Sequence, residues 1–197
     1  MAKFKSIYFI ALLSLMACKD TYEVTSYIPQ EMKPYFVDFQ PGTYWIFRDS
    51  IDTNYYDTLV LVQKERVDRV AEELSRFSKK TEAREGMQLH YQSTKKRNIY
   101  VYVGSGPRNS SARFDPRPSP RGELRFEYID LNWSANIIKQ DSLWIEGVPY
   151  HDVLSSHGSN HQINWVSVAK HSGIIQLAGT DSEGTYRFLN VIEVVKP

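Results

Sequence analysis

The stretch TYRFLNVIEVV, residues 185–195, does most to decide the fold of this chain. Its side chains alternate in direction: Tyr186, Phe188, Asn190, Ile192 and Val194 point one way, and Leu189, Val191 and Val195 point the other. Alternation with a period of two is typical of a strand that has two different faces. β-Branched and aromatic residues, which suit a pleated and half-buried surface, fill most of the stretch. The sequence therefore predicts a long β-strand near the C-terminus.

The same alternation predicts strands through most of the chain. Residues 44–49 and 56–63 flank a polar turn and predict a first hairpin. Residues 87–93 and 98–103 predict a second hairpin, which turns at three consecutive basic residues. Further strands are predicted over 123–129, 142–145, 150–155, 164–169 and 173–177. The pattern is that of a mainly β protein.

One segment has a helical period instead. Val67, Val70, Leu74 and Phe77 recur at spacings of three and four residues, which is one face of a helix. Glu, Arg, Lys and Ala, all good helix formers, fill the gaps. The spacing predicts a helix over 66–80, and the alternative is a long hairpin strand that continues from Val62.

Residues 105–122 are predicted to form a loop. Four prolines in this segment cannot donate hydrogen bonds to a sheet, and its glycines and serines favour irregular backbone. Four arginines lie in the same segment. They are interpreted either as a basic arm for phosphate head groups or acidic glycans, or as a solvated loop.

The N-terminus carries a lipoprotein signal pattern. Lys3 and Lys5 precede an apolar run over 6–16, and Leu15-Met16-Ala17-Cys18 reads as a lipobox. The run is shorter than the roughly 20 residues that a transmembrane helix needs. Cys18 is the single cysteine of the chain and falls where the lipidated residue must be. The sequence predicts a signal peptide over 1–17, lipidation of Cys18, and attachment to the membrane through the N-terminal lipid.

The remaining organisation follows from composition. Residues 18–34 are predicted to be the lipidated cysteine and a tether, and 35–197 a single β-rich domain. Without Lys3 and Lys5 the chain has 22 basic and 23 acidic residues, so no nucleic-acid partner is expected. Lys19 follows the cysteine in place of the aspartate that retains lipoproteins in the inner membrane. The expected location is the outer membrane, with the periplasmic and surface leaflets both open.

Four aromatic residues are candidates for ligand binding. Tyr44, Trp45, Trp144 and Trp165 could line a sheet face that takes an apolar or glycan ligand. The alternative is that they fill the core, which aromatic residues commonly do in β proteins.

Histidines supply the candidate chemistry of an enzyme. His151, His157, His161 and His171 lie close together in the sequence, and the four-residue spacing of His157 and His161 is a metal-ligand spacing on a helix. Gly158, Ser159 and Asn160 between them are loop residues, which weakens this reading. His151, His157 and His161 therefore remain weak metal candidates, and no cofactor or catalytic residue is assigned.

Two segments resemble uncharacterised Bacteroidota envelope lipoproteins. Residues 39–50, FQPGTYWIFRDS, resemble their first hairpin, in which a Gly-x-Tyr-Trp strand follows the tether. Residues 147–153 and 169–175 resemble their closing strands. The resemblance implies a single curved antiparallel sheet, a half-barrel or a sandwich, and it transfers no catalytic residue.

The expected function is a non-catalytic binding or assembly role in the cell envelope, with an apolar or glycan ligand or a protein partner. The alternative is a metal-dependent or hydrolytic envelope enzyme that uses the region from His151 to His171.

Overall fold

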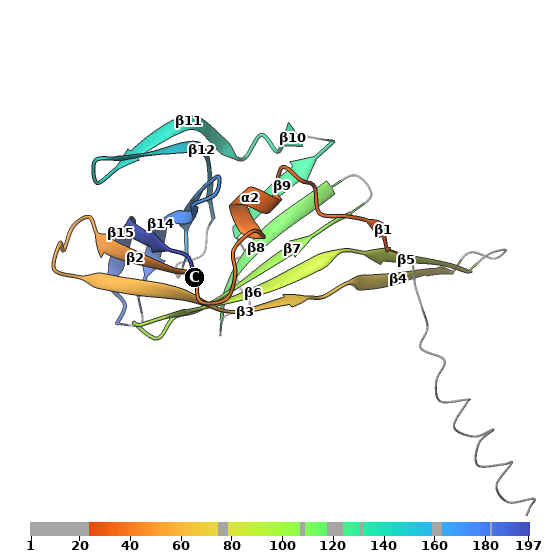
Figure 1. The fold of residues 1–197 in the computed structure, drawn as a ribbon, viewed down its shortest axis with the longest axis horizontal. Coiled ribbons are helices and arrows are strands. Elements are labelled where there is room, and N and C mark those ends of the chain that lie inside the picture. Colours follow the sequence, from red (N-terminus) through yellow and green to blue (C-terminus); the bar gives the residue numbers. More distant parts are fainter. Residues whose placement is uncertain are drawn as a thin grey trace, which may run out of the picture.

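The computed structural model describes residues 24–74, 79–106, 109–117, 124–130, 132–158, 163–181 and 183–197. These residues form a mostly β protein with one curled antiparallel sheet of 12 strands, a half-barrel (Figure 1). The mainly β fold predicted from the sequence is confirmed. The first seven strands of the sheet are β2 (Tyr44–Asp49), β3 (Tyr56–Arg66), β6 (Gly86–Ser93), β7 (Asn98–Gly104), β8 (Asn109–Arg117), β9 (Leu124–Ile129) and β10 (Asn132–Trp133). The other five are β11 (Ile138–Ile145), β12 (Val148–His157), β13 (Trp165–Ala169), β14 (Gly173–Thr180) and β15 (Tyr186–Val195).

The sheet is built as two runs of neighbouring strands that meet in its middle. Its order is β10-β9-β8-β7-β6-β3-β2-β15-β14-β13-β12-β11, so the C-terminal strand β15 pairs with β2. The two edge strands, β10 and β11, are consecutive in the chain, which means that the sheet curls until its edges approach each other. The Ser156 hydroxyl of β12 donates a hydrogen bond across this seam to the Arg125 carbonyl of β9, at 2.8 Å.

A second, three-stranded sheet extends one end of the molecule. β4 (Arg69–Leu74) and β5 (Lys79–Arg84) form an antiparallel hairpin, and β1 (Val24–Ser26) adds parallel to β5. All three lie together at one end of the view in Figure 1.

The N-terminal segment fills the inside of the half-barrel. α2 (Lys33–Phe36) is a single helical turn, and in the described part of the chain no helix is long and apolar enough to cross a bilayer. The Phe36 ring lies 5.4 Å from the ring of Phe126 and 6.3 Å from that of Phe114, measured between centroids. The Lys64 ammonium donates to the Val37 carbonyl at 2.6 Å, which fixes the segment to β3. The interior of the sheet is therefore occupied by the chain's own side chains.

This packing corrects the predicted tether. Ile28 and Met32 are buried, and β1 is part of a sheet, so the described part of the predicted tether, 24–34, belongs to the domain. The apolar residues of 24–34 are spaced irregularly, so the sequence shows neither a strand period nor a helix period there. In the structure these residues nevertheless pack against the sheet. Residues 1–23, including the predicted signal peptide and Cys18, lie outside the described residues.

The predicted helix over 66–80 is wrong, and the hairpin alternative is correct. Arg69–Leu74 pairs with Lys79–Arg84 as β4 and β5, and residues 75–78 lie outside the described ranges. Two of the four residues of the predicted apolar face, Val67 and Val70, are exposed. A helix in this place would have had no surface against which to bury its apolar stripe, whereas the hairpin satisfies its backbone through pairing.

The predicted loop over 105–122 is wrong in its middle. Residues 109–117 form β8, which pairs with β7 and β9. Ser110, Ala112 and Phe114 are buried in alternation, a period of two that the flanking prolines concealed in the sequence. Residues 107–108 and 118–123 lie outside the description.

Candidate functional site

The predicted aromatic residues do not gather on one face. Trp45 is fully buried: its ring lies 5.4 Å from that of Phe39 and 5.6 Å from that of Tyr91, and its indole N–H donates to the Ser172 carbonyl at 2.7 Å. Tyr44 precedes it on β2 and faces the other side of the sheet, where it is half-buried. These contacts place Trp45 in the core.

The other two predicted aromatics lie on separate strands. Trp165 on β13 is half-buried, and its indole N–H donates to the Ser167 hydroxyl at 2.9 Å. Trp144 is 69% exposed on the edge strand β11. Trp144 is therefore the one of the four that offers a large surface to a partner.

The histidines lie on one strand and one turn. His151 and His157 are both exposed on β12, and His171 occupies the turn before β14 with a positive φ of 61°. His161 is outside the described residues. Among the residues that are described, no group of three His, Cys, Asp or Glu side chains could hold a metal ion. The enzyme alternative stays a prediction.

A groove that sequence reasoning missed lies where the two sheets join. Its volume is about 400 Å³, and its walls come from β4 and β5 on one side and from β6, β7 and β8 on the other. Gly86 of β6 pairs directly with Gly104 of β7. Neither residue has a side chain that could project from the sheet between the walls of the groove. A Cβ at Gly86 would lie 2.2 Å from the Val67 carbonyl oxygen, whereas a Cβ at Gly104 would meet nothing within 4 Å. The missing side chain at Gly104 leaves open space in the groove, whereas the missing side chain at Gly86 lets the Val67 backbone pack against β6.

Arginines dominate the charge of this groove. Arg69 and Arg84 lie directly opposite each other on β4 and β5, and Arg113 enters from β8. Like charges on paired strands repel each other. Glu82 relieves part of this repulsion, because its carboxylate lies 3.5 Å from the guanidinium of Arg84. The Glu85 carboxylate accepts a hydrogen bond from the Ile28 backbone N–H at 2.7 Å.

The N-terminal chain runs along the rim of the groove. Ser26 is the register partner of Arg84, and its carbonyl accepts a hydrogen bond from the Ser105 hydroxyl at 2.8 Å. Ser105 and Glu85 both line the groove. The structure therefore places the groove beside the point at which the described chain begins.

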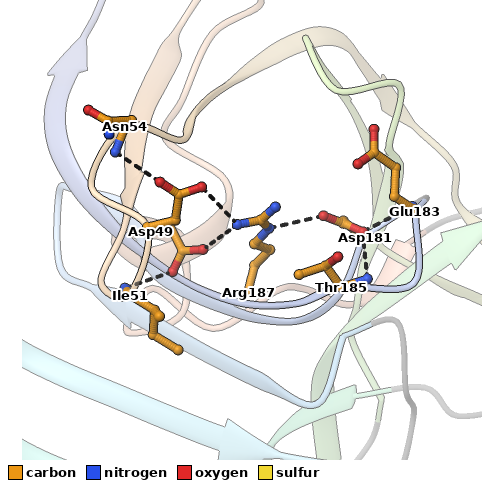
Figure 2. Close-up of polar contacts among 8 residues, drawn as sticks. Asp49, Ile51, Asn54, Asp181, Glu183, Thr185 and Arg187 are labelled. Atoms are coloured by element: carbon orange, nitrogen blue, oxygen red, sulfur yellow. Dashed lines mark hydrogen bonds and ion pairs between the residues drawn. The ribbon is translucent and has the colours of Figure 1, made fainter.

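A buried charge cluster occupies the opposite end of the sheet. Figure 2 shows Arg187 of β15 between two carboxylates: its Nη1 lies 3.1 Å from Asp49 Oδ2, and its Nε lies 3.0 Å from Asp181 Oδ2. The side chains of Asp49 and Asp181 are 1% and 4% exposed, and that of Arg187 is 13% exposed. The Arg187 guanidinium also lies 4.1 Å from the centroid of the Tyr55 ring. This cluster joins the turn after β2 to the turn before β15.

The charges of the cluster support one another. Burial alone would raise the pKa of Asp181, but hydrogen bonds from the backbone N–H of Thr185 and from Arg187 outweigh it and hold that pKa below its usual value. The hydrogen bond to Asp181 in turn raises the pKa of Arg187. Because each charge is bonded to protein atoms, the cluster is suited to holding turns together.

A shallow cleft of about 440 Å³ lies where α2 meets the two edges of the sheet. Tyr35 of α2 and Trp133 of β10 pack edge to face, with ring centroids 5.8 Å apart. Burial, together with the negative charge of Asp152, raises the pKa of the Tyr35 phenol to about 12. The Lys170 ammonium lies 3.6 Å from the Asp152 carboxylate at the mouth of the cleft. Asp152 and Lys170 thus form an ion pair at the mouth of the cleft, and Glu31 adds a second acidic side chain to its lining.

Some of these residues could have been found from the sequence. The turn Asp52-Thr53-Asn54 was visible, but its coupling to Arg187 depends on the pairing of β15 with β2, which no local pattern shows. Arg69 lies in the segment for which the sequence predicts a helix, and its position opposite Arg84 depends on the pairing of β4 with β5, which no local pattern shows.

Comparison with known proteins gives one structural similarity. The chain is similar to a crystal structure of a protein from Parabacteroides distasonis that is described as a "putative lipoprotein", with 9% sequence identity and a TM-score of 0.32 over 88% of this chain and 100% of that chain. No protein-family model and no curated protein matches the chain. At a TM-score of 0.32 the similarity carries no argument about function, so the proposals below rest on the residues of this chain.

Proposed function

We propose that this protein is a lipoprotein, anchored in the outer membrane through Cys18, with a non-catalytic role in binding or assembly in the cell envelope. The observation that carries the anchor is the lipobox Leu15-Met16-Ala17-Cys18, in a sequence with no second cysteine. The basic start and the short apolar run before it complete a secretory signal.

The chain between Cys18 and β1 is short, so the anchor would hold the domain close to the membrane. Val24 is already held in β1, so six residue steps separate it from Cys18, and a fully extended chain of that length spans about 20 Å. The end of the molecule that contains β1, β4 and β5 is thus kept near the bilayer. The cluster around Arg187 lies at the other end of β6, a strand of eight residues that measures about 25 Å.

The packing favours a partner on the outer surface over a ligand inside the sheet, because residues 28–39 already fill the interior. β11 is an edge strand of the 12-stranded sheet, and it carries the exposed ring of Trp144. Edge strands of this kind are surfaces on which other chains can pair. An envelope protein that binds at β11 is the partner that we propose.

The anchor is tested by the mass of the N-terminal peptide of the protein extracted from membranes. A lipidated peptide that begins at Cys18 is the expected result, and Cys18→Ala should leave the membrane fraction. A Cys18→Ala protein that partitions into membranes as the wild type does would refute the anchor.

The partner is tested by cross-linking in intact cells. Trp144→Ala should remove a cross-linked species that the wild type forms, whereas Tyr186→Ala, which removes an exposed aromatic from another strand, should retain it. A cross-linking pattern that Trp144→Ala leaves unchanged would exclude β11 as the binding surface.

A further inference from the structure

The cleft between α2 and the two edges of the sheet contains a hydroxyl group that the fold leaves unused. Tyr35 is only 9% exposed, and its ring packs against those of Phe36 and Trp133. In the described part of the chain no protein group is hydrogen-bonded to the Tyr35 hydroxyl, and burial and the charge of Asp152 alone raise the pKa of the phenol. Buried tyrosine hydroxyl groups usually have a hydrogen-bond partner. Because Tyr35 lines the cleft, a bound ligand would supply the partner that the protein does not.

Acceptors for the hydroxyl groups of a ligand line the same cleft. The carboxylates of Asp152 and Glu31 and the amide of Gln30 belong to its walls. Asp152 lies in the middle of β12 with a φ of 51°, a conformation that residues other than glycine seldom adopt. Its side chain is 58% exposed, and that of its ion partner Lys170 is 44% exposed. Exposed ion pairs contribute little to stability, so both side chains can exchange this contact for contacts with a ligand.

An aromatic ring forms an apolar wall beside these polar groups. The half-buried indole of Trp133 lines the cleft. The rings of Tyr35 and Tyr128 pack edge to face against it, with centroid distances of 5.8 Å and 5.1 Å. These contacts hold the indole in place before a ligand arrives, which lowers the entropy that binding costs.

The arrangement of these groups selects a ligand that carries hydroxyl groups. A single hydroxyl oxygen can accept a hydrogen bond from the Tyr35 phenol while its proton is donated to the Asp152 carboxylate. An ammonium or guanidinium group has no acceptor for the phenol proton, and a carboxylate ion has no donor for Asp152. A sugar ring has hydroxyl groups around its rim and C–H groups on its faces, which fit carboxylates beside an indole. The cleft volume of about 440 Å³ lies within the range of small-molecule sites.

We propose that the cleft lined by Tyr35, Trp133 and Asp152 binds a saccharide. The Tyr35 hydroxyl donates a hydrogen bond to it, the Asp152 carboxylate accepts one from it, and the face of a sugar ring packs against the Trp133 indole. This site is separate from the partner surface proposed at β11, because Trp144 does not line the cleft, and it does not depend on the lipid anchor.

The test begins with a glycan array, probed with the full mature protein in a detergent that has no sugar head group. The free oligosaccharide of the strongest signal is then titrated by calorimetry. Tyr35→Phe should weaken its binding about fivefold, the usual effect of one hydrogen bond between uncharged groups. Asp152→Asn should weaken it about tenfold, because hydrogen bonds to a charged acceptor are stronger. Tyr186→Phe removes an exposed phenol hydroxyl from β15 and should leave binding unchanged.

Thermal unfolding separates a ligand-binding hydroxyl from a structural one. Because the fold makes no hydrogen bond to the Tyr35 hydroxyl, Tyr35→Phe without ligand should keep the Tm of the wild type. A lowered Tm would show that the fold uses this hydroxyl, and would overturn the argument.

Three other results would also overturn the proposal. They are the absence of binding to every saccharide on the array, binding that Tyr35→Phe leaves unchanged, and an equal loss in Tyr35→Phe and Tyr186→Phe. Trp144→Ala should bind the saccharide as the wild type does, so failure of the proposed partner surface and failure of the saccharide site are distinguished.

Discussion

Removal of the Arg187 guanidinium tests the charge cluster most directly. In Arg187→Met the volume of the side chain is largely kept, but Asp49 and Asp181 are left as nearly buried carboxylates without a cation. Breaking a buried pair by removing one partner costs about 3–5 kcal/mol. Arg187 retains some exposure, and Asp52, whose carboxylate also lies 3.4 Å from Arg187 Nη1, is half-exposed. We therefore expect about 3 kcal/mol, the lower end of this range. For a domain of this size the loss lowers Tm by about 9 °C.

The pH dependence of this loss has a definite sign. In the wild type the pKa of Asp181 lies below its usual value, so its contribution to stability is present above the unfolded pKa and is lost as the pH falls through the folded pKa. Without Arg187 the buried carboxylate of Asp181 takes up a proton more readily in the folded state, which makes the variant relatively more stable as the pH falls. The stability difference between variant and wild type should therefore shrink from pH 7 to pH 5.

The assay is urea unfolding followed by tryptophan fluorescence at both pH values. Arg187→Lys is the matched control: it keeps the charge but loses the paired hydrogen bonds, and we expect it to fall between wild type and Arg187→Met. A loss below about 1 kcal/mol, or an equal loss at pH 5 and pH 7, would refute the reasoning, because it would mean that the carboxylates are not held charged by Arg187.

Three other predictions concern the filled interior. Phe36→Ala should destabilise the protein by about 3 kcal/mol, because it leaves a cavity between α2 and the sheet. Phe36→Leu should cost less, and equal losses of the two variants in urea unfolding would contradict this. Gly173→Ala should lower stability by about 2 kcal/mol, because the residue has a φ of +73° and a Cβ would lie 3.0 Å from Trp45; an unchanged Tm would show that the site relaxes. In ultraviolet titration Tyr35 should ionise near pH 12, and Asp152→Asn should lower that pKa; no shift would assign the effect to burial alone.

The strands could be predicted where one face is buried and the other is not. Residues 185–195 show this alternation, and β15 lies there, with Leu189 and Val191 buried. The period of two comes directly from the geometry of a strand, so it is visible without tertiary information. The same reasoning found both predicted hairpins, including the turn between β6 and β7.

The errors occurred where local pattern and tertiary context disagree. Val67 and Val70 mimic a helical stripe, but they are exposed beside a groove and bury nothing in the described structure. The apolar residues of 24–34 have no period, and the sequence therefore predicts a tether there. Their burial depends on a sheet that the rest of the chain forms, so no local pattern reveals it. The lipobox is a local pattern that can be read from the sequence, whereas the groove depends on how the β4–β5 hairpin lies against β6, β7 and β8, which no local pattern shows.

The pairing of β2 with β15 has a consequence for the order of folding. Asp49 and Arg187 are separated by 138 positions in the chain, and they meet at one end of β2 and β15, the two strands at the centre of the strand order. Contacts between such distant positions close a long loop and slow folding. A chain that is synthesised from its N-terminus makes β2 to β10 available first, and these strands can pair among themselves while β2 keeps an open edge. That edge can be covered only after the last strand has been made, so the half-finished sheet is the species that is most exposed to aggregation.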